Sequence, residues 1–498
     1  MIQTKFIGRG TELGELNHLL EEPSVMAAVY GRRRVGKTTL LLEWIRRTGR
    51  SSFYWMAKNA TPEALRENLA QAIWAWAYPD EVDPEPPIFR DWGHLFKEFA
   101  RLIDASQQPL IAVWDEFSFA VEADRSLPSF LQEAWDHMLK DRPLTLLLAG
   151  SHIGMMVDLA QYKQPLYGRI TARLPIEPLP YSALQDFLPK LSSVERLATY
   201  SVLGGIPAYL ERFKDNLSTV DNIRDQLFRR VGFFRSEPDQ LLGELARDSG
   251  RYLSILRAVA DGKTSSGEIA AQLKLSTGDV TPYLKRLRDM HFINRRLPLS
   301  IPDDQREGSI RGRYYIRDPY LRFYYRFVER NADRIEQGLI DIAWQRISEQ
   351  LRAYVGGGAF EEICWEWLQI QAQKQALPFE PELIGSEWNT EAQVDVAAIN
   401  HREKIILLGE CKWTGERIRR DVVTELVYEK SPKVLPGKDW AVHYYFFSRS
   451  GFTPEALKEI EQHSGRAITF AQVDKDLRQH FLSVSLPVSP LVRLKLTD

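Results

Sequence analysis

A glycine-rich stretch near the amino end constrains the fold of this chain more than any other feature. Residues 31–39 read Gly-Arg-Arg-Arg-Val-Gly-Lys-Thr-Thr and fit the spacing G-x-x-x-x-G-K-[ST]. An apolar run at 24–30 precedes them and predicts a short buried strand, and 39–47 has helical periodicity. Strand, glycine loop and helix in this order predict a phosphate-binding loop.

The chemistry of such a loop assigns roles to its residues. Glycines let the backbone curl so that successive N–H groups face one phosphate, and the helix that follows adds the positive end of its dipole. Lys37 is expected to reach the β- and γ-phosphates of ATP, and Thr38 to hold Mg²⁺. The expected cofactor-binding residues of the loop are Gly31, Arg32, Arg33, Arg34, Val35, Gly36, Lys37, Thr38 and Thr39.

Two further apolar runs end in polar side chains. Residues 109–116 read Pro-Leu-Ile-Ala-Val-Trp-Asp-Glu, the pattern of a buried parallel strand whose carboxyl end faces a ligand. Asp115 is expected to hold Mg²⁺ through water, and Glu116 to polarise the attacking water. The run 144–149 predicts the next strand, after which Ser151 is a candidate sensor of the γ-phosphate.

Three other segments complete the first part of the chain. The acidic, proline-rich stretch 79–87 predicts a surface loop. Arg169 precedes a strand-like run at 172–176 and is a candidate arginine finger, in its own site or in a neighbour's, although an exposed arginine without such a role fits the pattern too. Residues 181–245 look helical, with a break at 203–210 caused by two glycines and a proline.

These pieces together resemble the archaeal-type ATPases, a clade of the signal-transduction ATPases with numerous domains (STAND) and related to AAA-like proteins. The resemblance spans residues 6–210 and rests on Phe-Ile-Gly-Arg (6–9), the phosphate loop (31–38), Trp-Asp-Glu-Phe (114–117), Gly-Ser (150–151), Leu-Tyr-Gly-Arg (166–169) and Gly-Gly-Ile-Pro (204–207). It implies a P-loop fold that binds ATP, with Walker A and Walker B motifs. It also implies that Phe6 and Ile7 lie beside the adenine, and that Pro207 packs near it.

The middle of the chain predicts two short helices around a tight turn. Residues 265–273 and 276–288 each begin with a capping box, and the second helix has Lys285, Arg286 and Arg288 on its outward face. This arrangement resembles a winged helix-turn-helix, with tracts 291–297 and 313–317 as the wing. Between Arg251 and Arg330 there are 16 Lys and Arg against 9 Asp and Glu, and a local basic excess is typical of nucleic-acid binding. Winged helices in this superfamily also pack on the nucleotide domain, so both interpretations remain open.

The last part of the chain places three charged side chains on two predicted strands, 391–399 and 404–413. Side chains two apart on a strand share a face, so Glu410 and Lys412 point the same way, and Asp395 on the neighbouring strand can reach them. Charges in such an apolar setting are costly unless they bind something. Mg²⁺ held by Asp395 and Glu410, with Lys412 orienting a water, is an arrangement that cleaves phosphodiesters.

This spacing resembles the PD-(D/E)XK nuclease fold, in which a helix bearing Glu is followed by Asp and then by Glu-x-Lys. The resemblance assigns Asp395 to the Asp position, and Glu410 and Lys412 to Glu-x-Lys. It assigns Glu361 or Glu362 to the acid on the helix, which joins the metal site. Asp395 stands in Val-Asp-Val instead of the family's Pro-Asp. A Glu–Lys pair on a solvated edge strand is the alternative, because the motif is short.

Length and composition bound the remaining possibilities. A chain of 498 residues exceeds one core, and we expect four parts: an ATPase core (1–180), a helical lid (181–245), a winged-helix-like domain (246–330) and a nuclease-like domain (331–498). Cys364 and Cys411 are the two cysteines, too few for a disulfide framework, and no Cys/His spacing predicts zinc. With no apolar run of membrane-spanning length and no signal peptide expected, we predict a cytoplasmic protein.

Three functions compete on this basis. The leading hypothesis is an α/β protein in which an ATP-dependent switch controls DNA binding by the basic helix 280–288 and Mg²⁺-dependent DNA cleavage by the C-terminal domain. The second is a nucleotide-sensing regulator or scaffold, a homo-oligomer on binding ATP, whose nuclease-like domain is non-catalytic. The third, a processive motor, lacks additional helicase motifs.

Overall fold

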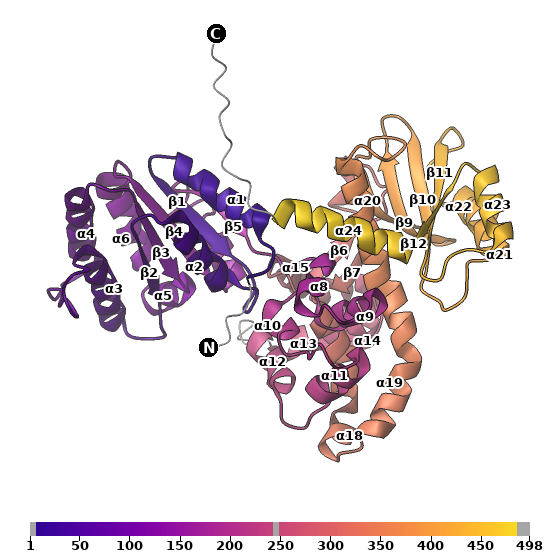
Figure 1. Ribbon diagram of the computed structural model, residues 1–498, viewed down its shortest axis with the longest axis horizontal. Helices are drawn as coiled ribbons and strands as arrows, with labels where there is room; N and C mark the ends of the chain where they lie inside the picture. The colour runs from indigo at the N-terminus through magenta and orange to yellow at the C-terminus, as the bar shows by residue number, and fades with distance from the viewer. Residues whose placement is uncertain (1–5, 243–248, 486–498) are drawn as a thin grey trace, which may run out of the picture. The chain divides into compact units, whose positions relative to one another are not determined.

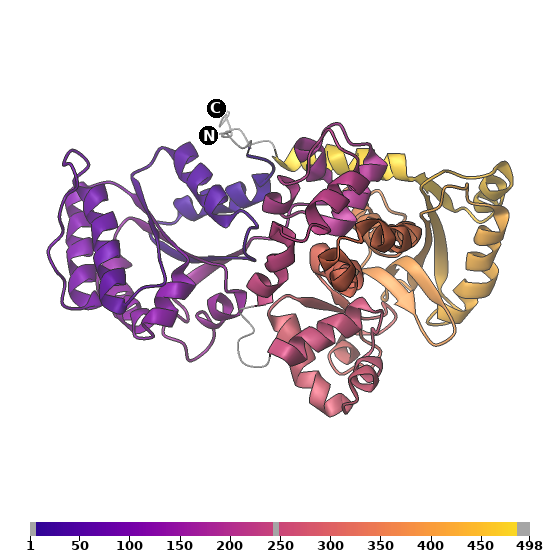
Figure 2. The ribbon, with the colours of Figure 1, turned by 90° about the horizontal axis from the view of Figure 1, so that it is seen from below.

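A computed structural model describes residues 6–242 and 249–485 of the chain. The described residues form two compact units (Figures 1 and 2). Unit 1 contains the residues up to Leu179, together with Ile206–Ala208, Val484 and Ser485; unit 2 contains Pro180–Gly205 and Tyr209–Ser483. The expected boundary between residues 245 and 246 lies outside the described residues, and the four-part division of the chain stays a prediction.

Unit 1 is built on a five-stranded parallel sheet with the strand order β2-β3-β4-β1-β5. Its central strands are mostly apolar because both faces of a parallel sheet are covered. The strands are β1 (Val25–Tyr30), β2 (Ser52–Met56), β3 (Leu110–Asp115), β4 (Leu144–Gly150) and β5 (Ile170–Pro175).

Helices cover both faces of this sheet (Figure 1). The core on one face is rich in aromatic rings, among them Trp55, Phe99 and Trp114, and includes residues of α3 to α6. No helix or strand lies between α3 and α4, where the proline-rich loop runs over the surface with Val82 exposed. The helices are α1 (Gly10–His18), η1 (Leu19–Glu21), α2 (Lys37–Thr48), α3 (Pro62–Ala77), α4 (Trp92–Ser106), α5 (Phe117–Ala123), α6 (Leu127–Ala134), η2 (Trp135–Leu139) and α7 (Ile153–Asp158).

The first part of unit 2 is helical. It contains η3 (Tyr181–Ala183), α8 (Leu184–Phe187), α9 (Ser193–Leu203), α11 (Thr219–Leu227), α12 (Phe233–Leu242) and α13 (Ser249–Ala260), and α10 (Pro207–Leu210) crosses the division between the units. The break at 203–210 falls where expected, between the end of α9 and the start of α10.

The two predicted capped helices follow as α14 (Ser266–Leu273) and α15 (Thr277–Asp289), each with its capping box formed. β6 (Ile293–Arg296) and β7 (Arg313–Ile316) pair antiparallel as the wing, on either side of α16 (Asp303–Arg306). The aromatic segment after the wing is core, since Tyr320, Phe323 and Tyr325 are all buried. This segment and the helices after it are α17 (Pro319–Phe323), η5 (Tyr324–Val328), η6 (Glu329–Asn331), α18 (Ala332–Glu336) and α19 (Ile340–Val355).

The C-terminal part of unit 2 is a mixed five-stranded sheet with the order β12-β11-β10-β9-β8. β9 is antiparallel to β8 and β10, whereas β10, β11 and β12 run parallel. Its strands are β8 (Leu383–Trp388), β9 (Gln393–Asn400), β10 (Ile405–Lys412), β11 (Ala441–Ser448) and β12 (Arg466–Thr469). His443 lies on β11.

Separate apolar cores lie on the two faces of this sheet. One core contains residues of α20 (Glu361–Gln373) and α24 (Phe470–Ser485), and the other contains residues of the helices after β10. Those helices are α21 (Arg420–Thr424), η8 (Glu425–Lys430), α22 (Ser431–Val434) and α23 (Pro454–Gln462), and η7 (Gly356–Phe360) leads into α20. None of the helices in the described residues combines the length and apolar character that crossing a membrane requires.

Gly204 ends α9 in a backbone conformation that side chains disfavour, with φ 63° and ψ −156°. A Cβ atom there would stand 3.1 Å from the Cδ atom of Pro319. We expect Gly204→Ala to lower the free energy of unfolding by about 1–3 kcal/mol, measured from urea unfolding curves, because the strained backbone and the crowded ring both work against the methyl group.

Gly267→Ala is the matched control. Gly267 lies in α14 with nothing within 4 Å of an added Cβ. Alanine there should raise the free energy of unfolding by about 0.5–1 kcal/mol. Equal effects of the two substitutions would contradict this account of the α9 terminus.

Candidate functional sites

The phosphate loop of unit 1 runs from the end of β1 to the first residue of α2. Arg34 and Gly36 adopt left-handed conformations, with φ 67° and 96°, and these turn the backbone into the helix. Lys37 is buried, and its Nζ atom donates to the carbonyl oxygens of Gly31 and Arg32 at 2.8 and 3.3 Å. The ammonium group is therefore held against the loop itself.

Two contacts fix the base of the loop. A Cβ atom on Gly31 would stand 2.3 Å from the carbonyl oxygen of Ile176, so only glycine fits there. Arg9 is buried and donates to the carbonyl oxygens of Val35 and Glu177 at 2.8 and 2.7 Å. Sequence reasoning gave Arg9 no role, and the structure makes it a brace between the loop and the chain after β5.

Asp115 lies at the carboxyl end of β3 and is completely buried. Its Oδ2 atom accepts hydrogen bonds from the hydroxyl groups of Thr38 and Tyr54 at 2.6 and 2.7 Å. Burial, with Asp115 beside it, raises the pKa of the Tyr54 phenol, which keeps Tyr54 a proton donor. Tyr54 is a second residue that sequence reasoning missed, because nothing in β2 marks it as polar-facing.

Glu116 and Ser151 also meet. Glu116 has φ 52°, a conformation that turns its side chain out of the strand direction. Its Oε2 atom accepts a hydrogen bond from the Ser151 hydroxyl at 2.8 Å, at the end of β4. The carboxyl ends of β3 and β4 thus bring together the predicted water-polarising carboxylate and the predicted sensor.

The other predicted residues of unit 1 are dispersed. Pro207 lies beside the loop, with its Cγ atom 3.8 Å from where a Cβ of Gly36 would be. Phe6 has the Arg47 guanidinium 5.3 Å from its ring centroid, and Ile7 is half-buried. Arg169 makes a two-fold ion pair with Asp136 at 2.7 and 3.1 Å, which a finger role would have to break.

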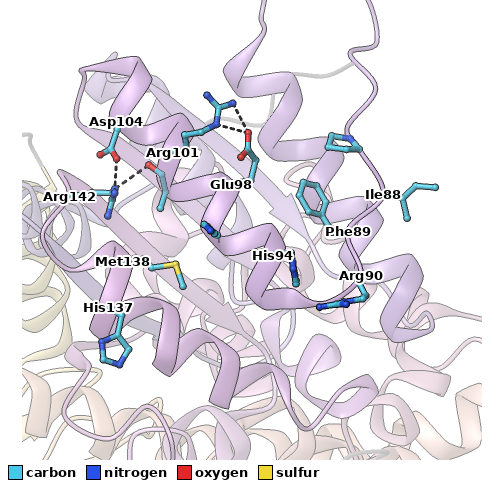
Figure 3. Close-up of a pocket in the computed structure, with 13 residues that line it drawn as sticks. Ile88, Phe89, Arg90, His94, Glu98, Arg101, Asp104, His137, Met138 and Arg142 are labelled. Carbon is cyan, nitrogen blue, oxygen red and sulfur yellow. Dashed lines mark hydrogen bonds and ion pairs between the residues drawn. The ribbon is translucent and has the colours of Figure 1, made fainter.

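A cleft of about 1150 Å³ lies elsewhere in unit 1, along α4 and the end of the proline-rich loop (Figure 3). Four of its charged side chains form two ion pairs: Arg101 with Glu98, and Arg142 with Asp104. None of the phosphate-loop residues lines it. The cleft is therefore separate from the candidate nucleotide site.

The second candidate site lies where β9 and β10 meet in unit 2. Glu410 is 2% exposed, and Lys412 donates to its Oε1 atom at 2.6 Å. Lys430, from η8, donates to both carboxylate oxygens of Glu410 at 2.9 and 3.0 Å. Asp395 on β9 accepts the backbone N–H of Cys411 at 2.9 Å, which places it next to Glu410 along the strand.

Burial and neighbouring negative charges raise the pKa values of the carboxyl groups of Asp395 and Glu361 in this cluster. Burial, followed by the repulsion from Glu410, raises the pKa of Asp395 to about 6. Burial and then Asp395 raise the pKa of Glu361. Burial disfavours the charged form of Lys412, but the attraction of Glu410 outweighs it and raises the pKa of Lys412.

The two acids at the start of α20 have different surroundings. Glu362 accepts from Arg296 at 2.7 Å and from Arg322 at 3.1 Å. Burial opposes its ionisation, but these two guanidinium groups lower the pKa of Glu362 overall. The pKa of Glu361 is affected by the charge of Asp395, whereas the carboxylate of Glu362 forms ion pairs with Arg296 and Arg322.

The described residues contain no group of three or more His, Cys, Asp or Glu side chains placed to hold a metal ion. Asp395 and Glu410 offer the oxygen ligands that Mg²⁺ prefers, and Mg²⁺ commonly keeps several water ligands with only one or two carboxylates. Asp395 and Glu410 therefore fit a Mg²⁺ ion that keeps water molecules as its other ligands. Cys364 and Cys411 are both free thiols, and His443 stacks on Phe379.

The basic residues of the winged-helix region divide into two groups. Lys285, Arg286 and Arg288 are exposed on α15. Several arginines of the wing instead contact the C-terminal sheet: Arg313 donates to Gln393 at 2.7 Å and stacks 4.8 Å from the Trp388 ring centroid. The local excess of positive charge is thus only partly available to a nucleic acid.

Hydrogen bonds also join the wing loop to β8. Ser300 donates its N–H and its hydroxyl to the buried carboxylate of Glu387 at 2.7 and 2.8 Å. Arg311 donates to the carbonyl oxygen of Trp388. The wing is therefore docked on the strands that lead to Asp395.

The pKa of Asp395 leads to a prediction about stability. Its usual value is 3.8, so the folded state holds this proton more tightly than the unfolded chain does. The stability that Asp395 contributes is therefore complete below about pH 4 and is lost as the pH rises through about 6. Without divalent ions, Asp395→Asn should raise the free energy of unfolding at pH 8 by up to about 3 kcal/mol, and by less than about 1 kcal/mol near pH 4.

Urea unfolding at the two pH values in EDTA measures this difference. Glu403→Gln removes an exposed carboxylate from the neighbouring turn and controls for the change in net charge. A gain from Asp395→Asn that is the same at both pH values would show that Asp395 is not the titrating group.

Comparison with known proteins shows which protein families the chain is similar to. Residues 6–213 match a family model described as an ATPase domain predominantly from Archaea. Residues 249–295 match the arsR family of bacterial regulatory proteins, and 324–422 match archaeal and bacterial proteins of unknown function. The fold is similar to that of the Walker-type ATPase PABY2304 of Pyrococcus abyssi, with a TM-score of 0.51 and 21% identity, over 65% of this chain and 97% of that one.

A protein of Methanocaldococcus jannaschii, "Uncharacterized protein MJECL04", is similar over nearly its whole length. It is 33% identical over 445 residues, which are 88% of this chain and 94% of that protein. Together with the matched models, this similarity extends from the phosphate loop through the helix-turn-helix into the C-terminal sheet. The chain belongs to the family of MJECL04, and its amino-terminal part is a P-loop ATPase domain of the archaeal type.

Proposed function

We propose that this protein is a switch that binds and hydrolyses ATP, and that controls DNA binding and Mg²⁺-dependent DNA cleavage by the C-terminal domain. The ATPase part rests on one cluster of contacts. Thr38 of α2 donates to Asp115 at the end of β3, and Ser151, which follows β4, donates to Glu116, so these contacts lie at the carboxyl ends of the strands. Ligands of open parallel sheets bind at this edge.

The residues in this cluster have separable tasks. Lys37 and the loop N–H groups would hold the phosphates, and Thr38 and Asp115 would hold Mg²⁺, whose charge offsets the charge on the transferred phosphoryl group. Glu116, kept in place by Ser151, would accept a proton from the attacking water. Arg9 and Tyr54 do not need to touch the nucleotide, since they brace the loop and Asp115.

The cleavage part rests on the buried carboxylate and lysine cluster of β9 and β10. Asp395 and Glu410 would hold Mg²⁺, which supplies a Lewis acid for the phosphodiester. Lys412 is half-buried beside them and would orient a water or stabilise charge on the phosphorus centre. Lys430 shares Glu410 with Lys412, so it would position the carboxylate instead of reacting itself.

DNA binding would use α15. Its exposed Lys285, Arg286 and Arg288 lie on the second helix of a helix-turn-helix, which is the helix that enters the major groove in such motifs. Contacts from exposed lysine and arginine to phosphates give most non-specific affinity.

One observation favours a second candidate function, that of a nucleotide-sensing regulator with a non-catalytic nuclease-like domain. Both carboxylate oxygens of Glu410 already accept ammonium donors. Oε1 accepts from both lysines and Oε2 from Lys430 alone, so a metal ion at Glu410 would take the one acceptor site left on Oε2 or displace an ammonium group. In this alternative the cluster is a structural ion-pair network, and ATP changes the assembly of the chain without any cleavage.

Lys37→Ala and Glu116→Gln separate binding from hydrolysis. We expect Lys37→Ala to weaken ATP binding by at least about thirtyfold, because losing one member of a buried charge contact costs roughly 2 kcal/mol or more. Glu116→Gln should keep the affinity for ATP and lose about 10²–10⁴-fold in turnover. Titration calorimetry and phosphate release measure the two effects, with exposed Lys97→Ala as the control.

Light scattering on the same proteins with and without ATP tests assembly. Association that requires ATP and is absent in Lys37→Ala would show that bound ATP controls assembly, as the regulator alternative expects. Wild-type protein that hydrolyses ATP no faster than Glu116→Gln would refute the proposed role of Glu116.

Lys412→Ala tests cleavage directly. With Mg²⁺ or Mn²⁺ and ATP, we expect the wild-type protein to cut DNA and Lys412→Ala to be slower by at least about 100-fold, since Lys412 is the polarising group of the site. The matched control is Lys433→Ala, an exposed lysine of α22 close in sequence to Lys430. Gel assays on linear, nicked and branched DNA in which wild type leaves every substrate intact would favour the non-catalytic regulator.

A further inference from the structure

A small basic pocket lies in unit 2, apart from the two candidate sites. Its volume is about 250 Å³. Four arginines line it from four different elements: Arg326 of η5, Arg330 of η6, Arg334 of α18 and Arg346 of α19. The helices α18 and α19 are labelled in Figure 1. No residue of the phosphate loop, of the Asp395 and Glu410 cluster or of α15 takes part in the lining.

The positive charge of this pocket is not balanced from within. Asp261 is the one carboxylate in the lining, and it pairs with Arg330. Arg334 donates to the amide oxygen of Asn331 at 2.9 Å, and Arg326 lies 5.5 Å from the ring centroid of Phe327. Within the part of the chain that the structure describes, Arg326, Arg334 and Arg346 have no carboxylate partner.

This combination points to a particular ligand chemistry. A guanidinium group presents a planar fork of donors that matches the oxygens of a phosphate, and concave walls concentrate the field of like charges. Asn331 is buried at the pocket and keeps Arg334 in one orientation. Arg334 and Arg330, which Asn331 and Asp261 hold, lose less freedom on binding an anion than unrestrained arginines would.

We propose that this pocket binds phosphate groups of a phosphorylated ligand. Drug-sized ligands occupy pockets of about 300–1,000 Å³. At about 250 Å³ this pocket is smaller, so it would enclose one or two phosphate groups and leave a base or sugar outside. The phosphate can come from two sources, a small phosphorylated molecule or the backbone of bound DNA.

The wall of the pocket belongs to the helix-turn-helix. Asp261 directly follows α13, and its Oδ2 atom accepts a hydrogen bond from Gln272 of α14 at 3.3 Å. An anion bound among the arginines would therefore alter the contacts of Asp261 and, through it, those of Gln272 in α14, the helix before α15. This proposal is independent of ATP hydrolysis and of DNA cleavage, which involve other residues.

The test uses inorganic pyrophosphate as the probe, in full-length Lys37→Ala protein, so that the phosphate loop contributes little. Titration calorimetry should detect one saturable site in this protein. Adding Arg346→Ala should weaken it by at least about tenfold, since losing a charge-assisted hydrogen bond has an effect of that size. Adding Arg352→Ala, an exposed arginine further along α19 and outside the lining, should leave the affinity unchanged.

Arg334→Gln serves as a second variant in case Arg346→Ala unfolds, which circular dichroism would reveal. It should weaken pyrophosphate binding while preserving a donor toward Asn331. If the Lys37→Ala protein shows no saturable pyrophosphate binding, or if the variants of Arg346 and Arg352 bind it equally, the pocket is only a solvated arginine cluster and the proposal is wrong.

A second arm identifies the source of the phosphate. Fluorescence anisotropy with a short DNA duplex compares the same proteins. If Arg346→Ala lowers the affinity for the duplex as strongly as it lowers that for pyrophosphate, the pocket holds the DNA backbone. If duplex binding is unchanged while pyrophosphate binding falls, the ligand is a small phosphorylated molecule.

Discussion

The cost of burying a carboxylate governs both candidate sites of this protein. Asp115 is completely buried and Glu410 is 2% exposed. An unpaired buried charge costs several kcal/mol, and pairing lowers that cost only when the geometry is good. Each of these carboxylates therefore requires donors: Asp115 receives them from α2 and β2, and Glu410 receives them from its own strand and from η8.

This requirement also orders the surroundings. Because Thr38 donates to Asp115, the start of α2 is tied to the end of β3, which anchors the α2 end of the phosphate loop. In unit 2, Lys430 ties η8 to β10 in the same way. Within the described residues Asp395 forms no ion pair with a lysine or an arginine, and burial, followed by the repulsion from Glu410, raises its pKa to about 6. A cation bound beside both carboxylates would offset this repulsion.

Much of the nucleotide site could be predicted from the sequence. Short apolar runs ending in polar residues identified β1, β3 and β4, and the ends of parallel strands necessarily share one edge of the sheet. Tyr54 and Arg9 could not be found in this way. Tyr54 reaches Asp115 only because β2 pairs with β3, and Arg9 reaches Val35 only after the chain has folded back over the loop. Such partners depend on pairing that no local pattern encodes.

The same limit applies to the C-terminal domain. Period-two alternation was enough to place Glu410 and Lys412 on one face of β10, and the acids at the start of α20 were both candidates. Nothing local distinguished Glu361 from Glu362, because the difference lies in Arg296 and Arg322, which come from the wing and from α17. Lys430 was missed because it stands in a helix whose return to β10 is set by the packing of η8 on the sheet.

The docked wing changes how the helix-turn-helix is to be understood. Wing arginines that contact Trp388 and Gln393 are less available to a nucleic acid, so the proposed DNA contact in this region would rest on α15. The same contacts connect the helix-turn-helix to β8 and β9, and Arg296 connects it to Glu362, next to Glu361. The wing thus joins the helix-turn-helix to the sheet that carries Asp395, and several of its arginines are used in contacts within the protein, which accounts for part of the local excess of positive charge.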